Sequence, residues 1–398
     1  IVGLDEFIGM YIVKACRREF GEHMSDYSYI GMDREEIDTP ALLIDLDLLE
    51  ENIETMAGYY RGKRSAALLP HQKGHRLPII AKKQIDGGAK GVSMTSLGLA
   101  EYYVNCGITN ILITSEIYGR NKIRRLCSLS RHANITVGVD DVENVRQLSE
   151  AALAGDTRIN VAVELYMGAR SCGVEMGDVK SFVKEVVRFR GVNFRGLWWH
   201  QGSLASMRSW EERRKADFET MDKVAALKDE LQDEGITVEM LSGGYTATWN
   251  ITPEYPHLSN VGVQAGSYVF SDWCSHEFEG LEVFDYALTV LTRCISKPKE
   301  NQALFDFGMN SCADEATHDY GSVVGPKFKD LLGVKGVYQR EEISTVLFDR
   351  RDGSIRVGDV FEAIPPHSDT TAKIHDKYYC MRNNKVEAIW PNYGRGLF

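Results

Sequence analysis

The sequence predicts an α/β protein, namely a (β/α)8 barrel of the TIM type followed by a mainly β domain. Eight apolar segments of strand length, rich in β-branched residues, recur along the chain: 65–70, 91–95, 110–115, 135–140, 159–166, 194–200, 238–242 and 260–265. Stretches with helical periodicity separate most of them, and this alternation is typical of a closed barrel. Past Trp273 the pattern changes to short strands without long helices. An open doubly wound sheet is the rival fold, but its opening glycine fingerprint is absent.

The elements before the first barrel strand divide into an arm, a strand and a helix. Residues 1–31 are predicted to form a helical arm, with apolar residues at helical spacing. A strand at 41–46 and a helix at 48–60 follow. We therefore expect a barrel domain at 48–275 and a β domain at 276–398, and we expect the early strand within 38–47 to join the β domain.

The positions of glycine residues support the prediction of helices between the barrel strands. Glycine follows the predicted helices, as it does after many helix ends: 78–86, 97–106, 142–154 and 207–234. The connection at 243–259 has the weakest helical pattern, because it contains Pro253 and Pro256. In the second domain the pattern predicts five strands, at 286–295, 302–307, 332–338, 343–347 and 357–364.

Composition narrows the functional class. The chain has 398 residues, a net charge of −11 and no block rich in lysine and arginine, which argues against nucleic-acid binding. Its eight cysteines lack C-x-x-C spacing, which favours reduced thiols in a cytoplasmic protein. The apolar run at 1–13 contains Asp5 and Glu6 and is too short to span a membrane. We predict a cytoplasmic enzyme that acts on a small molecule.

The most informative residue is Lys73, which lies in Pro70-His71-Gln72-Lys73-Gly74-His75 directly after the first barrel strand. Reactive groups of a barrel collect at the carboxyl ends of its strands. A lysine there can condense with a carbonyl to form a Schiff base. For an isolated lysine, the alternative of a solvated surface residue would be the better interpretation.

Glycine-rich turns after strands seven and eight favour a reactive Lys73 over a solvated surface lysine. The first is Ser242-Gly243-Gly244-Tyr245-Thr246, and the second is Gly266-Ser267-Tyr268. Backbone N–H groups and hydroxyls at these two turns are how a barrel binds phosphate. A lysine on strand one together with such a cradle predicts a site for pyridoxal 5′-phosphate, which offers an aldehyde to the lysine and a phosphate to the turns.

Two other strand ends and one motif in the β domain complete the candidate site. Glu164 to Gly173 follows strand five and contains Tyr166 and Arg170, and His200-Gln201-Gly202 follows strand six. His367-Ser368-Asp369 is predicted to be extended, so that His367 and Asp369 point to one side as two ligands of one metal ion would. The nearby pair His375-Asp376 is interpreted as structural.

Taken together, these motifs resemble the D-threonine aldolase and D-serine dehydratase family of fold-type III pyridoxal-phosphate enzymes, with the closest likeness to the 3-hydroxy-D-aspartate aldolase branch. The resemblance runs from about Met32 to the end of the chain. The motifs that carry it are Asp38-Thr39-Pro40, the His-x-Lys-x-His around Lys73, Ser242-Gly243-Gly244, Gly266-Ser267-Tyr268, His367-x-Asp369 and Ile389-Trp390-Pro391.

The resemblance implies an alanine-racemase-like barrel, a homodimer, and a divalent ion (Mn²⁺, Mg²⁺ or Zn²⁺) held by His367 and Asp369. Dehydratases of the family usually carry His-x-Cys at the metal motif, so Asp369 favours an aldolase. The expected cofactor contacts are Lys73, Tyr166, Arg170, Gln201, Ser242, Gly243, Gly244, Thr246, Gly266, Ser267 and Tyr268. The expected substrate contacts are Gln201, Asp314 and Glu315.

Some positions depart from the family pattern. The family's arginine usually stands where Ser171 is, one residue after Arg170, and His200 stands where tyrosine is common. Asp314 and Glu315 argue against a carboxylated substrate such as hydroxyaspartate, unless Arg170 neutralises it. The cofactor and metal motifs are kept, so the side chain of the preferred substrate is less certain than the type of reaction.

The expected reaction is cleavage of the Cα–Cβ bond of a β-hydroxy-D-amino acid to glycine and an aldehyde. His200 or a metal-bound hydroxide would take the proton from the β-hydroxyl, and Arg170 would lie near the phenolic oxygen of the cofactor. The alternative for Arg170 is an ion pair with an acid such as Glu164. The alternative activities are those of a dehydratase, a racemase, and a non-catalytic pyridoxal-phosphate carrier.

Overall fold

The computed structural model describes residues 26–398, apart from residue 64 and the segments 169–171, 317–322 and 349–354. Most of the predicted N-terminal arm, residues 1–25, therefore lies outside the described residues. From the predicted arm, the structure describes the 3₁₀ turn Asp26–Tyr29.

The predicted barrel is present as a sheet of eight parallel strands. In spatial order they are β2 (Ala66–Leu68), β9 (Val261–Val263), β8 (Met240–Gly243), β7 (Val192–Trp199), β6 (Ile159–Leu165), β5 (Asn134–Val139), β4 (Asn110–Glu116) and β3 (Val92–Met94). Each overlaps one of the eight predicted segments. Between β2 and β3 the sheet closes through a parallel bridge from His71 to Ser93, where the Gln72 N–H donates to the Ser93 carbonyl at 2.8 Å.

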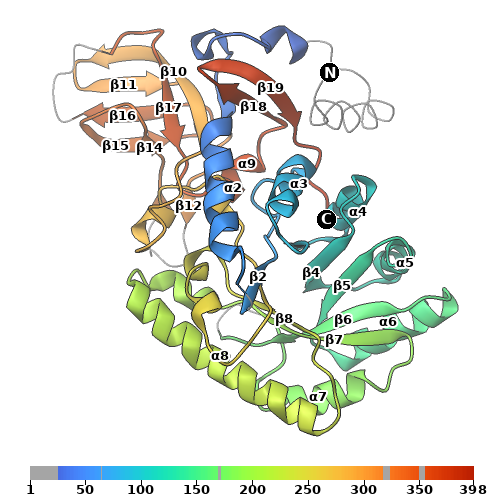
Figure 1. Ribbon diagram of the computed structural model, residues 1–398. Helices are drawn as coiled ribbons and strands as arrows, with labels where there is room; N and C mark the ends of the chain where they lie inside the picture. Colours follow the sequence, from blue (N-terminus) through green and yellow to red (C-terminus); the bar gives the residue numbers. More distant parts are fainter. Residues whose placement is uncertain (1–25, 64, 169–171, 317–322, 349–354) are drawn as a thin grey trace.

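Helices cover the outside of these strands (Figure 1). They are α2 (Leu46–Tyr60), α3 (Pro78–Asp86), α4 (Leu97–Asn105), α5 (Arg120–Leu129), α6 (Val142–Ala154), α7 (Val179–Val186) and α8 (Trp210–Asp233). The ends of α6 show why the sequence predicts them well. Asp141 caps its start by accepting from the Asn144 N–H, and Gly155 follows its end. The connection from β8 to β9 contains only the 3₁₀ turns Thr246–Thr248 and Thr252–Glu254, as its weak pattern predicted.

A mixed sheet forms the second part of the molecule. Its strands are β1 (Ala41–Asp45), β10 (Leu288–Lys299), β11 (Gln302–Phe305), β14 (Lys327–Phe328), β15 (Val334–Gln339), β16 (Ser344–Phe348), β17 (Val360–Ile364), β18 (Lys377–Arg382) and β19 (Lys385–Pro391). Two short strands, β12 (Glu315–Ala316) and β13 (Val323–Val324), pair separately. The early strand β1 lies between β10 and β18, so the chain enters the mixed sheet before it builds the barrel.

The two parts share apolar contacts. One buried cluster contains Leu42 and Ile44 of β1, Ile53 of α2 and Leu68 of β2, together with residues of the mixed sheet. In Figure 1, α2 runs from the mixed sheet at the top towards the barrel below it. Burial of this shared surface stabilises both parts together, because apolar area removed from water is favourable wherever it lies.

The metal motif departs from its predicted conformation. His367 has extended backbone angles, φ −141° and ψ 118°, but it is the N-cap of the short helix α9 (Ser368–Ala372). The expectation that His367 and Asp369 share one side of an extended segment is therefore wrong. The two side chains reach the same cavity because the chain turns into a helix between them.

Within the described part of the chain, no helix has both the length and the apolar composition needed to cross a bilayer. No disulfide bond joins any two of the described cysteines, which are Cys106, Cys127, Cys172, Cys274, Cys294, Cys312 and Cys380.

Candidate active site

A cavity of about 530 Å³ opens at the carboxyl ends of the barrel strands. The barrel contributes Lys73 after β2, Glu116 on β4, Glu164 on β6 and His200 after β7. The turns after β8 and β9 contribute Gly244, Thr246, Gly266 and Ser267, and the mixed-sheet part of the chain contributes His367 and Asp369. The cavity therefore collects most of the side chains that the sequence singled out.

Lys73 and Asp369 join the two parts of the molecule. The Lys73 Nζ atom lies 3.2 Å from the Asp369 Oδ2 atom; the Asp369 side chain is 2% exposed and that of Lys73 is 50% exposed. Burial alone would raise the pKa of Asp369, but the charges of Lys73 and His367 outweigh it and hold that pKa below its usual range. Asp369 is therefore a buried carboxylate whose charge depends on nearby cations.

His71 fixes the backbone that presents Lys73. Its Nδ1 atom accepts from the Lys73 N–H at 3.2 Å, so its Nε2–H donates to the Thr114 Oγ1 atom at 3.2 Å. Burial, followed by the charge of Lys73, lowers the pKa of His71 to about 3. The ring is consequently neutral at neutral pH and holds one tautomer.

The turns after β8 and β9 form one cradle. Thr246 Oγ1 accepts from the Gly266 N–H at 3.1 Å and from the Ser267 hydroxyl at 3.0 Å. A Cβ atom at Gly266 would lie 2.5 Å from the His71 carbonyl oxygen, so this turn can pack against the Lys73 loop only with glycine. The cradle thus brings hydroxyls and glycine backbone to the same cavity as Lys73.

Three other predicted cofactor contacts, Ser242, Gly243 and Tyr268, do not line the cavity. Their contacts are with other parts of the barrel domain. The Ser242 hydroxyl donates to the Gly262 carbonyl at 2.9 Å, which ties β8 to β9. A Cβ atom at Gly243 would lie 2.0 Å from the buried Trp199 ring, so packing explains this glycine. Tyr268 is 1% exposed, and its hydroxyl accepts from the Gln84 amide on α3 at 2.9 Å.

Gln201 also points away from the cavity. Its amide donates to the Thr220 hydroxyl on α8 at 2.7 Å, and the side chain is 3% exposed. The predicted contacts of Gln201 with cofactor and substrate find no support in this position.

The remaining predicted contacts are Tyr166, Arg170, Asp314 and Glu315. Tyr166 is half-buried and is not among the cavity residues. Arg170 and the side chain of Glu315 lie outside what the structure describes. Asp314 is half-buried beside Cys312 and is not among the cavity residues. The sequence-based argument that Asp314 disfavours a carboxylated substrate therefore has no geometric support.

His200, the predicted base, lines the cavity. Its ring opens onto the cavity, with its centroid 5.9 Å from that of Tyr245 in an edge-on arrangement. The surrounding protein, together with the charge of Lys73, lowers the pKa of His200 to about 4. At neutral pH the imidazole is therefore uncharged and can accept a proton.

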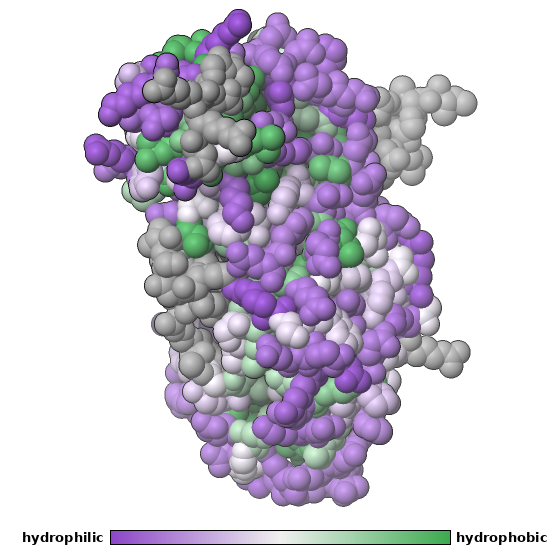
Figure 2. All heavy atoms as spheres, turned by 90° about the vertical axis from the view of Figure 1, so that its left-hand side faces the viewer, coloured by the Kyte–Doolittle hydropathy of each residue, from purple (hydrophilic) through white to green (hydrophobic). Residues whose placement is uncertain are grey.

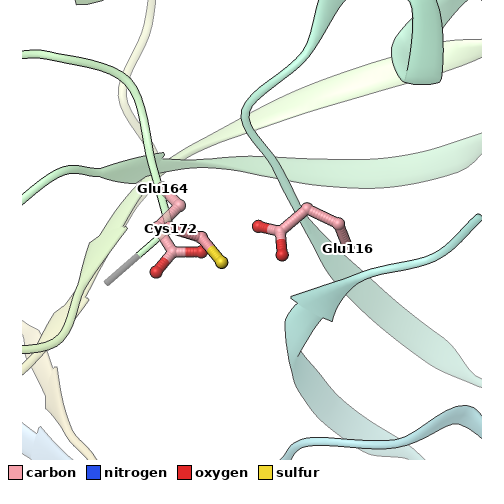
Figure 3. Close-up of side chains that lie close together, drawn as sticks. All are labelled: Glu116, Glu164 and Cys172. Carbon is pink, nitrogen blue, oxygen red and sulfur yellow. The ribbon is translucent and has the colours of Figure 1, made fainter. Parts of the chain in front are cut away.

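Glu116, Glu164 and Cys172 line the same cavity and are called the acidic wall below. Figure 3 shows that their side chains lie close together. One carboxylate oxygen atom of each glutamate and the Cys172 Sγ atom lie within 4.8 Å of one another. No other group of three His, Cys, Asp or Glu side chains comes this close in the part of the chain that the structure describes. Burial raises the pKa of Glu164 to about 10, and the hydrogen bond and charge of Glu116 add to this shift. Burial raises the pKa of Cys172 to about 11, and the carboxyl groups of Glu116, Glu164 and Asp140 add to this shift.

Sequence reasoning missed Glu116, His71, Thr114 and Asp272 as cavity residues. Glu116 could have been found, because it lies at the end of β4, and the rule that located Lys73 and His200 applies equally to the third barrel strand. His71 was part of a recognised motif but was given no role. Asp272 follows a 3₁₀ turn and carries no pattern of its own.

The class of protein is defined by two family models. The alanine racemase N-terminal domain matches residues 44–272, and a putative serine dehydratase domain matches residues 287–381. The chain is thus an alanine-racemase-like barrel joined to a dehydratase-type β domain.

Similar proteins narrow this class. A 3-hydroxy-D-aspartate aldolase of Paracoccus denitrificans (strain Pd 1222) is 32% identical over 92% of this chain and 94% of that protein. A D-threonine aldolase of Arthrobacter sp. is 30% identical over 91% and 93%. The crystal structure of D-threonine aldolase from Filomicrobium marinum superposes with a TM-score of 0.86 at 31% identity, covering 92% of this chain and 98% of that one. The chain belongs to the family of these aldolases, and the resemblance predicted from the sequence is confirmed.

Proposed function

We propose that the protein is a pyridoxal-phosphate- and divalent-metal-dependent aldolase that cleaves a β-hydroxy-D-amino acid into glycine and an aldehyde. One observation carries the proposal. The lysine, the glycine and hydroxyl cradle, and the His367/Asp369 pair come from separate parts of the chain, yet all three line one cavity. Relatives named as aldolases of D-configured β-hydroxy amino acids support the same activity.

The residues present fit pyridoxal phosphate. Lys73 offers an amine after β2, and the cradle of Gly244, Thr246, Gly266 and Ser267 lies in the turns that follow the neighbouring strands β8 and β9. A cavity of about 530 Å³ is within the usual size of cofactor sites. Lys73 would hold the aldehyde and the cradle would hold the phosphate.

The residues present also fit a divalent ion. An imidazole and a carboxylate are common ligands of Zn²⁺ and Mn²⁺. Asp369 is 2% exposed and forms its ion pair with the amine that the cofactor would occupy. Once that amine holds the cofactor, a buried carboxylate needs another cation, because an uncompensated buried charge is costly. His367 and Asp369 leave room for substrate oxygen atoms in such a site.

When bound, the metal ion supplies Lewis acidity and the cofactor supplies an electron sink. The residues of the chain orient the substrate and move its protons. His200 is the neutral base that would take the proton of the β-hydroxyl. His71 and Thr114 hold the Lys73 loop in place, and Asp369 would supply a carboxylate ligand to the divalent ion.

A dehydratase is the second candidate, since the β domain matches a putative serine dehydratase domain. It would use the same lysine but eliminate the hydroxyl. Asp369, which stands where dehydratases of the family usually have cysteine, favours the aldolase.

Product analysis tests the proposal. The purified protein with pyridoxal phosphate and Mn²⁺ should convert D-threonine, D-phenylserine or D-3-hydroxyaspartate to equimolar glycine and aldehyde, and it should leave the L-configured amino acids intact. A keto acid and ammonia without glycine would identify a dehydratase instead.

We also propose that the enzyme is a cytoplasmic homodimer, as the family resemblance implies. Exposed apolar residues of the mixed-sheet part support a contact with a second copy, namely Leu332 (87% exposed), Tyr338 (61%) and Val357 (61%). Figure 2 shows hydrophobic patches on the upper part of an otherwise largely hydrophilic face. Light scattering after size-exclusion chromatography should give twice the mass of one chain, and a monomer mass would contradict the proposal.

A further inference from the structure

Asp272 is a buried aspartate at the junction between the barrel and the metal motif. It is 1% exposed, lines the cavity, and follows the cradle residues Gly266 and Ser267 in the chain. Its Oδ1 atom accepts from the Ser275 N–H at 2.9 Å and the Ser275 hydroxyl at 2.6 Å. Its Oδ2 atom accepts from the Ser368 N–H at 3.0 Å and the Ser368 hydroxyl at 3.3 Å.

Ser368 is the residue between the two proposed metal ligands and is fully buried. Its N–H belongs to the first turn of α9, where backbone donors have no partner inside the helix. The N-cap of α9 is His367, whose side chain forms no capping hydrogen bond, so this helix start receives its side-chain acceptor from elsewhere. Asp272, on the barrel side, accepts from the first N–H of α9, and His367 lines the cavity.

The same stretch of chain also fixes the cradle. Ser271, directly before Asp272, has a positive φ of 53°, and its N–H donates to the Ser267 carbonyl at 2.8 Å. A serine in the left-handed region is uncommon and marks a tightly determined turn. Trp273, directly after Asp272, donates from its indole N–H to the Gly325 carbonyl at 3.1 Å. Asp272 thus lies in a short, constrained link between the cradle and the mixed-sheet part.

We propose that Asp272 is a positioning residue for the metal site, because its hydrogen bonds to Ser368 hold His367 and Asp369 in place relative to the cofactor cradle. This inference rests on the proposed function. All four groups around Asp272 are donors directed at its two oxygen atoms. An asparagine of the same shape can accept on one side only, since its NH₂ group would face a donor pair on the other side.

The test compares Mn²⁺ binding to the protein loaded with pyridoxal phosphate, measured by calorimetry and by the EPR signal of free Mn²⁺. Asp272→Asn should raise the Kd for Mn²⁺ by about 10- to 100-fold, the usual effect of losing a group that orients metal ligands. The absorbance of the bound cofactor should stay as in the wild type, since the Asp272 side chain hydrogen-bonds to Ser275 and Ser368 and not to Lys73 or the cradle residues.

Asp306→Asn is the matched control. Asp306 also accepts hydrogen bonds from two hydroxyls, those of Thr39 and Thr292, and from one backbone N–H, that of Arg293, but it does not line the cavity. It should leave the Kd for Mn²⁺ unchanged. An equal weakening in both variants would mean that general loss of stability, rather than positioning, is responsible, and would overturn the inference.

Two further outcomes decide the case. Wild-type affinity for Mn²⁺ in Asp272→Asn overturns the inference and leaves the proposed function intact, whereas absence of Mn²⁺ binding to the wild type overturns the metal part of both. If Asp272→Asn does not fold, Ser368→Ala carries the test. It removes one of the two Asp272–Ser368 hydrogen bonds, so it should raise the Kd in the same direction by a smaller factor, and an unchanged Kd overturns the inference.

Discussion

The barrel and the mixed-sheet part bring residues to one cavity in different ways. The barrel delivers Lys73, Glu164 and His200 through its topology, since each lies at the carboxyl end of a parallel strand. The mixed-sheet part delivers His367 and Asp369 through a five-residue helix that is anchored to the barrel by hydrogen bonds. The barrel side of the cavity follows from the fold, whereas the positions of His367 and Asp369 depend on the hydrogen bonds between Asp272 and Ser368.

The largest effect is expected from replacing Lys73, the proposed attachment point of the cofactor. Lys73→Ala should lower glycine formation by on the order of 10⁴-fold, because it removes the proposed attachment point of the cofactor. Lys73→Arg is the control: it keeps a cation for Asp369 and should fold normally, yet remain equally inactive. Borohydride reduction followed by peptide mass spectrometry should find the cofactor on Lys73, and an adduct on another lysine would refute the assignment.

Removing the proposed metal ion should abolish most of the activity while the cofactor stays bound to the barrel. Chelation by EDTA, or His367→Ala, should lower activity by about 10²-fold or more, since a Lewis acid contributes several kcal/mol to such a step. The bound-cofactor absorbance should persist. His375→Ala is the control, because His375 contacts the Ser311 carbonyl at 2.6 Å outside the cavity. Activity indifferent to both EDTA and His367→Ala would rule out the metal site.

Loss of the base should have a smaller effect. His200→Asn should lower kcat by about 10²-fold, the lower range for general acid–base catalysis. The charge of Lys73 contributes to the lowering of the His200 pKa to about 4. When the cofactor occupies that amine, the pKa should rise, so the acid limb of the wild-type kcat profile should lie above pH 4. A profile that keeps the same limb in His200→Asn would show that another group is the base.

The smallest expected effect concerns the acidic wall. The pKa of Glu164 in the folded protein is raised to about 10, so the folded state holds a proton that the unfolded state releases above its ordinary pKa. The stability linked to this proton is present below the unfolded pKa and is lost as pH rises towards 10. Glu164→Gln should therefore raise Tm by about 1–3 °C at pH 8 and flatten its pH dependence.

The opposite result would also be informative. If Glu164→Gln lowers Tm throughout the neutral range, then Glu164 is ionised and paired with a cation, which would support the predicted alternative of an ion pair with Arg170. Differential scanning calorimetry from pH 5 to pH 9 distinguishes the two outcomes.

The sequence predicted the barrel well because its signals are local. Apolar runs mark the strands and glycines follow the helices, so the predicted helices 78–86 and 142–154 agree with α3 and α6 to the residue. The hairpin of β18 and β19 was missed, although its turn, Asn383-Asn384, has positive φ at both residues, 51° and 62°. Asparagine tolerates that conformation, so the dipeptide was a usable signal.

The site was predicted only in part, since side-chain direction depends on tertiary contacts. Gln201 directly follows His200, yet its amide bonds to Thr220 on α8 while His200 opens onto the cavity. Gly243 fits a phosphate-binding pattern but is required by Trp199. Asp272 carries no sequence pattern because its role depends on Ser368, which is 96 residues away in the chain.

The central claim is that the lysine of the barrel and the metal motif of the mixed-sheet part serve one site. The ³¹P NMR signal of protein-bound pyridoxal phosphate tests it directly, since paramagnetic Mn²⁺ broadens the signals of nuclei near it. Stoichiometric Mn²⁺ should broaden the phosphate signal strongly in the wild type and not in His367→Ala. A sharp phosphate signal in wild-type protein that has bound one equivalent of Mn²⁺ would contradict the account.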